Sequence, residues 1–335
     1  MVPAGTMNPL PPYASLVQSL TELMGPDGCS RTPAGEISPQ PLPSSRAVYR
    51  FTFTQGSYPV VGKFFSDYPP ETALDRGLAQ EYHNYLQLQA LGLNHDTVPR
   101  LLGRRPEVRL GLLLEAVPGP DLDQLLAQAC AGSAPHLLNP ALDRLARLLI
   151  RFHSRPGETA PVTPAPALAY LAKVMGQLAG AGLLSPEDQR SLVKEGILWS
   201  KWFSRFPDRL VLVHGDATPT NFLFPNGRAV ALDLERLRVG DRLWDLSWVA
   251  GELKHAWGWR TGNFAAAEGA IRHFFSAYLA ALPPDPDIAR RLYHLNPFYM
   301  ALAELRIARN DYLSRDYRRE LVAEARRCLA GGRQW

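Results

Sequence analysis

The sequence has few cysteines and no apolar run long enough to cross a membrane. Three of its 335 residues are cysteines, and Cys29, Cys130 and Cys328 are too far apart to form a metal-binding motif. A membrane-spanning helix needs roughly 18–20 consecutive apolar residues. The first residues also lack the basic and apolar regions of a signal peptide. We therefore expect a protein of the reducing cytoplasm with no membrane partner.

The sequence also lacks a strong excess of charge of either sign. It has 36 lysines and arginines against 32 aspartates and glutamates, a formal net charge of +4. Dedicated nucleic-acid binders carry dense basic clusters, so we expect no nucleic-acid partner. Hydrophobic residues make up 46% of the chain, which is enough to bury the core of one large domain or of two lobes.

Polar residues of chemical interest follow an apolar run at residues 210–213. The run predicts a short buried strand. It leads to His214, Gly215 and Asp216, and Asn221 follows five residues after the aspartate. The strand therefore delivers two oxygen-bearing side chains to the segment that follows it.

Asn226 and Gly227 lie between two further apolar runs and predict a tight hairpin turn, since both residues tolerate positive φ. A two-residue turn places Asn221 diagonal to Asp233, beside the loop that carries Asp216. Converging oxygen ligands suit a hard cation such as Mg²⁺. A separate aspartate can orient a hydroxyl group for attack on a phosphoryl group. An ordinary hairpin with polar ends is the alternative for any one of these residues taken alone.

This spaced set of residues closely resembles the catalytic and metal-binding segments of kinases. His-Gly-Asp at residues 214–216 and Asp-Leu-Glu at residues 233–235 are more similar to the aminoglycoside phosphotransferase and choline kinase family. The resemblance implies that Asp216 is the catalytic aspartate and that Asn221 and Asp233 hold Mg²⁺. It also implies ATP as the other cofactor.

The resemblance extends to a lysine and a glutamate upstream. Residues 58–65 are predicted to form a strand that carries Lys63, and residues 71–91 a helix that carries Glu81. In kinases such a lysine holds the α- and β-phosphates, and the glutamate fixes the lysine by ion pairing. Without the downstream segment, two solvated surface residues are the alternative.

The join between the lobes is the next feature that the resemblance implies. An apolar run at residues 111–114 predicts a buried strand that ends at Glu115. In the resembled family the backbone of this join hydrogen-bonds the adenine. The resemblance therefore implies that the Glu115 carbonyl and the Val117 amide contact the nucleotide.

The sequence lacks the glycine-rich loop that covers the phosphates in protein kinases. The candidate replacement is the segment at residues 43–46, where the hydroxyl groups of Ser44 and Ser45 and the backbone amides can reach phosphate oxygens. A plain connecting loop is the alternative. The aminoglycoside kinases also do without the glycine-rich loop, so its absence favours that family over the protein kinases.

Three further residues are assigned around the catalytic segment. Residues 240–246 are similar to the family's Gly-Asp-Pro-x-x-Asp-Leu element, and Asp245 is expected to accept hydrogen bonds from amides of the catalytic loop. His214 is interpreted as a buried, hydrogen-bonded histidine, and His153 as a packed or capping one. Glu235 is left open between contact with metal or substrate and simple solvation.

The region after residue 250 is expected to select the acceptor. From residue 251 to 335 there are 13 lysines and arginines against 9 aspartates and glutamates. Family members that phosphorylate cationic aminoglycosides line this region with acids, so the balance favours a neutral or anionic alcohol. Tryptophans could form the aromatic cage of a choline kinase, but their helical spacing favours the core. They are Trp244, Trp248, Trp257 and Trp259.

We predict an α+β, two-lobed protein kinase-like fold with a small antiparallel-sheet N-lobe and a mainly helical C-lobe. Residues 1–35 form an N-terminal extension with a short helix, residues 36–117 the nucleotide-binding N-lobe, and residues 118–335 the helical C-lobe with the catalytic loop and substrate region. Residues 25–46 are predicted to be a loop with one short strand at most. The other predicted elements are a strand at 47–54 and helices at 13–24, 122–130, 141–153, 186–206, 265–282 and 297–330.

The predicted function is transfer of the γ-phosphoryl group of ATP, with Mg²⁺, to a hydroxyl group of a small molecule. The alternative is a catalytically silent kinase-like protein that binds a nucleotide or a partner. A protein kinase is a third possibility. Against it stand the missing glycine-rich loop, the His-Gly-Asp segment and the lack of an Ala-Pro-Glu segment.

Overall fold

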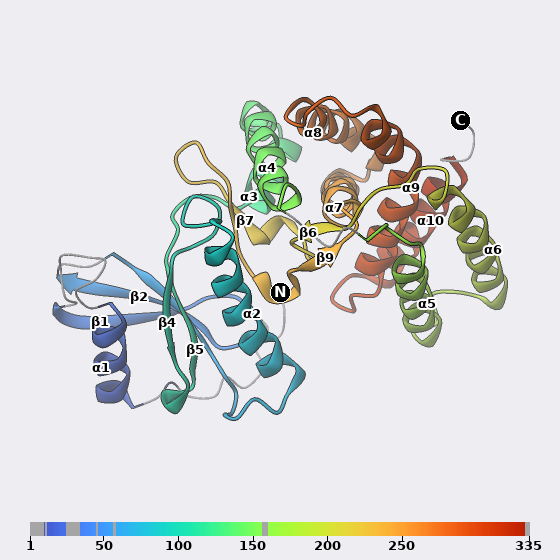
Figure 1. Cartoon of the computed structure of the whole chain (residues 1–335). Coiled ribbons are helices and arrows are strands. Elements are labelled where there is room, and N and C mark those ends of the chain that lie inside the picture. The colour runs from blue at the N-terminus through green and yellow to red at the C-terminus, as the bar shows by residue number, and fades with distance from the viewer. Residues whose placement is uncertain are drawn as a thin grey trace. The chain divides into compact units, whose positions relative to one another are not determined.

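The computed structural model describes residue 10 and residues 12–24, 34–44, 46–55, 58–155 and 160–331. Its backbone contacts divide the chain into two compact units (Figure 1). The N-terminal unit comprises Met1–Gly119 together with Val230–Arg236. The C-terminal unit comprises Pro120–Ala229 and Leu237–Trp335. A short segment from late in the chain thus belongs to the N-terminal unit.

The N-terminal unit contains a five-stranded antiparallel sheet with the strand order β1-β2-β3-β5-β4. Along β3, burial alternates, so Val60, Gly62 and Phe64 lie on one face and Lys63 lies on the other. The strands are β1 (Ala34–Pro41), β2 (Val48–Gln55), β3 (Val60–Phe64), β4 (Leu101–Arg105) and β5 (Leu110–Glu115).

Two helices and shorter elements complete this unit. Helix α1 (Tyr13–Leu23) buries Leu16 and Leu20 in one core cluster with Phe51 of the sheet. The N-terminal helix is therefore part of the core of this unit. Helix α2 (Ala73–Ala90) begins after Thr72, whose side chain accepts a hydrogen bond from the Asp75 amide. The shorter elements are η1 (Pro106–Val108), β8 (Val230–Ala231) and η4 (Leu234–Arg236).

Strand β1 is longer than the short strand expected within residues 25–46. It has eight residues, and buried Ile37 pairs with Phe53 of β2. Pro39 and Pro41 lower the strand propensity of this segment. They are tolerated because β1 lies at the edge of the sheet, where an outward-facing amide is not required.

The C-terminal unit is built around helix α7 (Leu243–Thr261). Most of α7 from Leu243 to Gly258 is buried, and it packs against neighbouring helices on several sides. Strands β6 (Val211–Val213) and β9 (Arg238–Gly240) pair antiparallel. The other elements are α3 (Leu122–Cys130), α4 (Leu138–His153), α5 (Ala165–Gly180), α6 (Pro186–Phe203), α8 (Glu268–Ala280), α9 (Pro286–Ala308), α10 (Arg315–Gly331), β7 (Phe222–Leu223), η2 (Pro135–Leu137), η3 (Pro219–Asn221) and η5 (Phe264–Ala267).

The prediction of one helix over residues 297–330 is wrong. Helix α9 begins at Pro286, where the Asp285 side chain caps the first turn, and it continues through Pro297. It ends at Ala308, and α10 begins at Arg315. The helix accommodates Pro297 internally at the cost of one backbone hydrogen bond.

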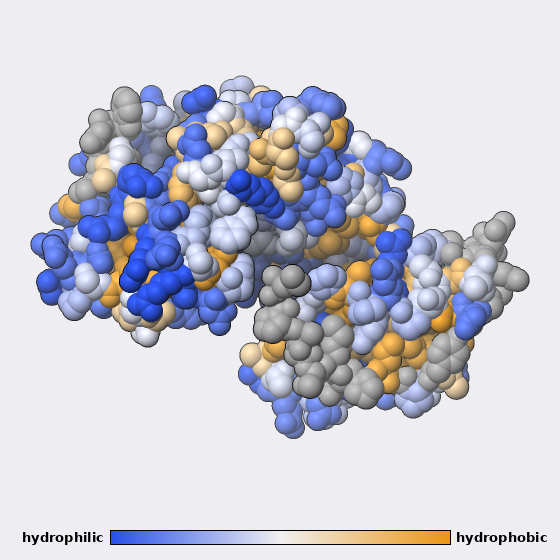
Figure 2. All heavy atoms as spheres, turned by 180° about the vertical axis from the view of Figure 1, so that it is seen from behind, coloured by the Kyte–Doolittle hydropathy of each residue, from blue (hydrophilic) through white to orange (hydrophobic). Residues whose placement is uncertain are grey.

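None of the helices among the described residues combines the length and apolar character of a bilayer-spanning segment. On the face of the molecule seen in Figure 2, hydrophilic residues are interspersed with smaller hydrophobic areas.

The packing of α1 predicts the effect of shortening one of its core side chains. Leu20 is fully buried, so Leu20→Ala should lower the free energy of unfolding by about 2–5 kcal/mol. Gln18→Ala on the exposed side of the same helix is the matched control. Urea unfolding measures both variants. Equal stability of the two would show that α1 does not contribute to the core.

Candidate active site

The N-terminal unit brings Lys63, Glu81 and Asp233 together. Lys63 Nζ donates hydrogen bonds to both carboxylate oxygens of Glu81, at 2.8 and 2.9 Å, and to Asp233 Oδ1 at 2.9 Å. The Glu81 side chain is fully buried, whereas that of Asp233 is 34% exposed. One ammonium group therefore joins β3, α2 and the segment before η4.

Burial and charge act in opposite directions on this group of residues. Burial alone would lower the pKa of Lys63, but the carboxylates of Glu81 and Asp233 raise it overall. Burial raises the pKa of Glu81, and the ammonium group of Lys63 offsets part of that rise. Removal of Lys63 would leave Glu81 buried without its main counter-charge, which is a costly state for a protein interior.

The segment around Asp233 is fixed to α2 by its backbone. The Leu234 amide donates to Glu81 Oε1 at 3.3 Å, and Asn84 Nδ2 donates to the Leu234 carbonyl at 2.6 Å. Asp233 itself has a φ of 56°, in the left-handed region that costs free energy for a residue other than glycine. These contacts hold the Asp233 carboxylate beside Lys63 despite the strained backbone.

Glu235 also has a defined position. It forms an ion pair with Arg46, and its side chain is 18% exposed. Gly77 allows this approach, because a Cβ atom there would lie 2.8 Å from Glu235 Oε2. Glu235 is thus neither simply solvated nor directed at Lys63; it anchors the end of the loop that precedes β2.

That loop contains the predicted phosphate-contacting serines. Ser44 is exposed, and its Oγ accepts a hydrogen bond from the Arg46 amide at 3.4 Å. Ser45 lies outside the described residues. At the end of β5, the Glu115 amide donates to the Arg100 carbonyl at 3.0 Å, while the Val117 amide makes no backbone hydrogen bond within the part of the chain that the structure describes.

In the C-terminal unit, Asp245 organises the segment that carries Asp216. The two Asp245 carboxylate oxygens accept hydrogen bonds from the amides of His214, at 2.8 Å, and Gly215, at 2.9 Å. Gly215 has a φ of 80°, a backbone conformation that glycine adopts without strain. Asp245 therefore fixes the backbone immediately before Asp216.

Two histidines support this arrangement. His214 is fully buried, and its Nδ1 accepts a hydrogen bond from the Asp216 amide at 3.3 Å. His153 lies between Asp245 Oδ2, at 3.1 Å, and the hydroxyl group of Tyr278, at 2.7 Å. Burial lowers the pKa of His153, although Asp245 opposes this change. Burial would raise the pKa of Asp245, but its hydrogen bond to His153 and the nearby charges lower it overall.

Asn221 is oriented by Asp216. Its Nδ2 donates to the Asp216 carbonyl at 3.0 Å, so the amide oxygen is directed elsewhere. The amide oxygen of Asn221 and the carboxylate of Asp233 are both hard oxygen donors of the type that Mg²⁺ binds. The donor chemistry of these residues fits a magnesium ion. The structure groups Asp216 with Asn221 in one unit, and Lys63 and Glu81 with Asp233 in the other.

Sequence reasoning missed one charged residue beside Asp216. Arg306 of α9 forms an ion pair with Glu252 and lies 3.5 Å from Asp216 Oδ1 through its Nη1. Its guanidinium carbon lies 5.4 Å from the ring centre of Trp248. The helical spacing of three residues in α7 could have predicted that they share one face of the helix. They are Asp245, Trp248 and Glu252. Nothing in the local sequence indicates that Arg306 reaches this face.

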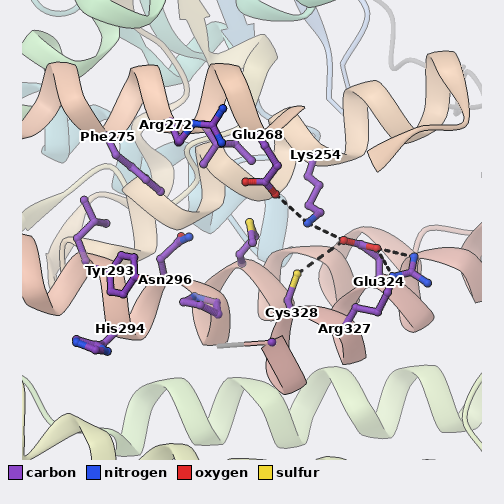
Figure 3. A pocket seen from close by; sticks show the side chains of 15 residues that line it. Lys254, Glu268, Arg272, Phe275, Tyr293, His294, Asn296, Glu324, Arg327 and Cys328 are labelled. Carbon is purple, nitrogen blue, oxygen red and sulfur yellow. Dashed lines mark hydrogen bonds and ion pairs between the residues drawn. The ribbon is translucent and has the colours of Figure 1, made fainter. Parts of the chain in front are cut away.

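Lys254 belongs to a different face of α7. It forms ion pairs with Glu268, at 3.4 Å, and Glu324, at 2.7 Å. Figure 3 shows these side chains lining a cavity of about 340 Å³ together with Arg327 and Cys328. The positive charge of Lys254 is therefore neutralised within this cavity. Lys254 is not one of the residues that contact Asp216.

The predicted aromatic residues divide between core and surface. Trp244 and Trp248 are buried with ring centres 4.8 Å apart, and both contact Tyr170. Trp259 is 50% exposed and packs on Tyr317. The first pair is part of the core of the C-terminal unit.

Comparison with solved structures identifies the fold. The structure is similar to that of choline kinase from Cryptosporidium parvum Iowa II, with a TM-score of 0.60 and 10% identity over 96% of this chain and 95% of that chain. For the ADP-bound aminoglycoside phosphotransferase APH(2'')-Ib, the TM-score is 0.56 and the identity 15%, over 95% and 97% of the two chains. For the GDP complex of aminoglycoside 2'-phosphotransferase-IIIa, the TM-score is 0.57 and the identity 13%, over 96% of this chain and 98% of that chain. The chain has the kinase-like fold of these enzymes, which confirms the predicted fold class.

The family follows from the sequence itself. Residues 39–292 match the model of the phosphotransferase enzyme family, and the chain belongs to that family. This match confirms the resemblance based on the residues around Asp216 and Asp233. No curated protein sequence matches the chain.

A histidine of α7 predicts a pH dependence of stability. Burial, followed by the charge of Arg260, lowers the pKa of His255 to about 4. An unfolded chain takes up this proton near pH 6.5, whereas the folded protein resists it. The contribution of His255 to the free energy of unfolding is fully present above pH 6.5 and is lost as the pH falls. The free energy of unfolding should therefore decrease by about 2 kcal/mol between pH 7 and pH 5 because of this residue.

His255→Gln should remove this part of the decrease when urea unfolding is compared at pH 7 and pH 5. His95→Gln changes a histidine with a 59% exposed side chain and should retain the wild-type decrease. An unchanged pH dependence in His255→Gln would contradict the lowered pKa of His255.

Proposed function

We propose that this protein transfers the γ-phosphoryl group of ATP to a hydroxyl group of a small molecule in a reaction that requires Mg²⁺. The observation that carries the proposal is the placement of Lys63 between Glu81 and Asp233 in a chain of the phosphotransferase enzyme family. A buried ammonium group held by two carboxylates is suited to binding phosphate oxygens.

In this proposal the N-terminal unit binds the nucleotide. Lys63 binds the α- and β-phosphates, and Glu81 keeps its ammonium group in place. The backbone at Glu115 and Val117 hydrogen-bonds the adenine, and Ser44 and Ser45 contact the phosphates. Support for a nucleotide comes from the similar structures, which contain ADP or GDP.

The C-terminal unit carries Asp216, which accepts the proton of the acceptor hydroxyl group. The acceptor oxygen attacks the γ-phosphorus, the bond from that phosphorus to the β–γ bridging oxygen breaks, and ADP leaves. The hydroxyl proton passes to the carboxylate of Asp216. Asp245 and His214 hold the backbone at Asp216 in position, so little reorganisation is required during transfer.

Asn221 and Asp233 would hold the magnesium ion. Bound there, the ion would neutralise charge on the phosphate oxygens. The orientation of the Asn221 amide supports this assignment, because its nitrogen is already bonded to the Asp216 carbonyl.

The central test is phosphoryl transfer from γ-labelled ATP with Mg²⁺ into a pool of small metabolites. Wild type should produce a labelled product. Asp216→Asn keeps the shape of the side chain but cannot accept the proton, and should lower the transfer rate by about 100-fold or more. Asp316→Asn changes an aspartate whose side chain is 89% exposed and should retain wild-type activity.

If wild type binds ATP but transfers no label, the protein is a silent nucleotide-binding member of its fold. If Asp216→Asn transfers label as fast as wild type, Asp216 is not the catalytic aspartate.

A further inference from the structure

Arg306 places a positive charge directly beside the proposed catalytic carboxylate. Its Nη1 is 3.5 Å from Asp216 Oδ1, which is an ion-pair distance rather than a short hydrogen bond. Its Nη2 donates a hydrogen bond to Glu252. One side of the guanidinium group is thus anchored, and Nη1 is directed toward Asp216.

The guanidinium group of Arg306 is held in place. Its side chain is 14% exposed, and Trp248 lies beneath it at 5.4 Å. Trp248 is itself buried in the core. A cation fixed between an aromatic ring and a carboxylate keeps its position when a ligand arrives, so its charge can discriminate between ligands.

The wider surroundings of this cation contain both signs of charge. Arg260 forms an ion pair with Asp123 at 2.7 Å. Both Arg260 and Arg306 add to the effect of burial in lowering the pKa of His255, while Asp123 opposes it. His255 is therefore neutral near pH 7, whereas Arg306 carries its charge at ion-pair distance from Asp216.

The position of this charge limits which acceptors can react. The attacking hydroxyl group must lie within hydrogen-bond distance of the Asp216 carboxylate. In a short amino alcohol, the ammonium group is only two carbons from that hydroxyl group and would approach Arg306. Two like charges at such a distance repel each other in a partly buried site. A carboxylate at the same position would instead gain a charge-assisted hydrogen bond.

We propose that Arg306 determines acceptor specificity by selecting a hydroxy acid, whose carboxylate it binds, and by rejecting amino alcohols. This assignment rests on the proposed function, because it concerns the acceptor of the same reaction. The excess of basic over acidic residues after residue 250 is in accord with it. Asp216 loses its contact with Nη1 when the acceptor carboxylate binds, and is then available to accept the hydroxyl proton.

The first experiment uses the wild-type protein and γ-labelled ATP. A metabolite extract is separated by ion exchange into anionic, neutral and cationic fractions before the reaction. Label should enter the anionic fraction, and ethanolamine and choline should not be phosphorylated. Label confined to the cationic or neutral fraction would overturn the specificity assignment while leaving the proposed function intact. Absence of label in every fraction would remove the proposed function and this inference with it.

The second experiment compares the acidic acceptor identified in this way with its uncharged amide. Arg306→Gln should lower kcat/KM for the acid by about 10- to 100-fold, mainly through KM. The kcat/KM value for the amide should change much less. Arg306→Lys retains the charge and should retain part of the preference for the acid. Arg309→Gln removes a charge from the residue that follows α9, whose side chain is bonded to Gln177, and should behave as wild type.

The ratio of the two kcat/KM values separates specificity from structural support. A residue that only stabilised the fold or the position of Asp216 would affect the acid and its amide equally. An unchanged ratio in Arg306→Gln, with Arg306→Lys also unchanged, would overturn the proposal.

Discussion

The buried ammonium group of Lys63 needs two carboxylates, and this requirement joins distant parts of the chain into the N-terminal unit. Glu81 comes from α2 and Asp233 from a segment that lies 170 residues after Lys63. The backbone amide of Leu234 also bonds to Glu81. A buried charge without its partners is costly, so these interactions specify where residues 230–236 lie.

Asp245 plays a comparable part in the C-terminal unit. Its carboxylate is completely buried and contacts two backbone amides and a histidine. Helix α7 supplies Asp245, Trp248 and Glu252 from one face, and thereby connects the segment before Asp216 to Arg306. In each unit, a buried carboxylate fixes the geometry of a more exposed one.

The sequence was most informative where chemistry depends on closely spaced residues. The fold class and family followed from the segment around Asp216 and Asp233, because loop and hairpin geometry keep such residues in register. The sequence was less informative where tertiary packing determines the bounds of an element or a contact between distant residues. Strand β1 contains prolines that are acceptable only at a sheet edge, and Pro297 lies inside α9. Arg306 reaches Asp216 from 90 residues away, and no local pattern reveals a contact of that kind.

The central claim is that Lys63, Glu81 and Asp233 form a site for nucleotide and magnesium. Titration calorimetry of ATP, with and without Mg²⁺, tests it most directly with wild type, Asp233→Asn and the exposed control Asp96→Asn. The account predicts that Mg²⁺ strengthens ATP binding by about tenfold or more in wild type and in the control, because Asp233 would help to hold the ion and the ion would neutralise charge on the phosphates. Asp233→Asn should lose this increase. An equal effect of Mg²⁺ in all three proteins, or no binding of ATP by wild type, would contradict the claim.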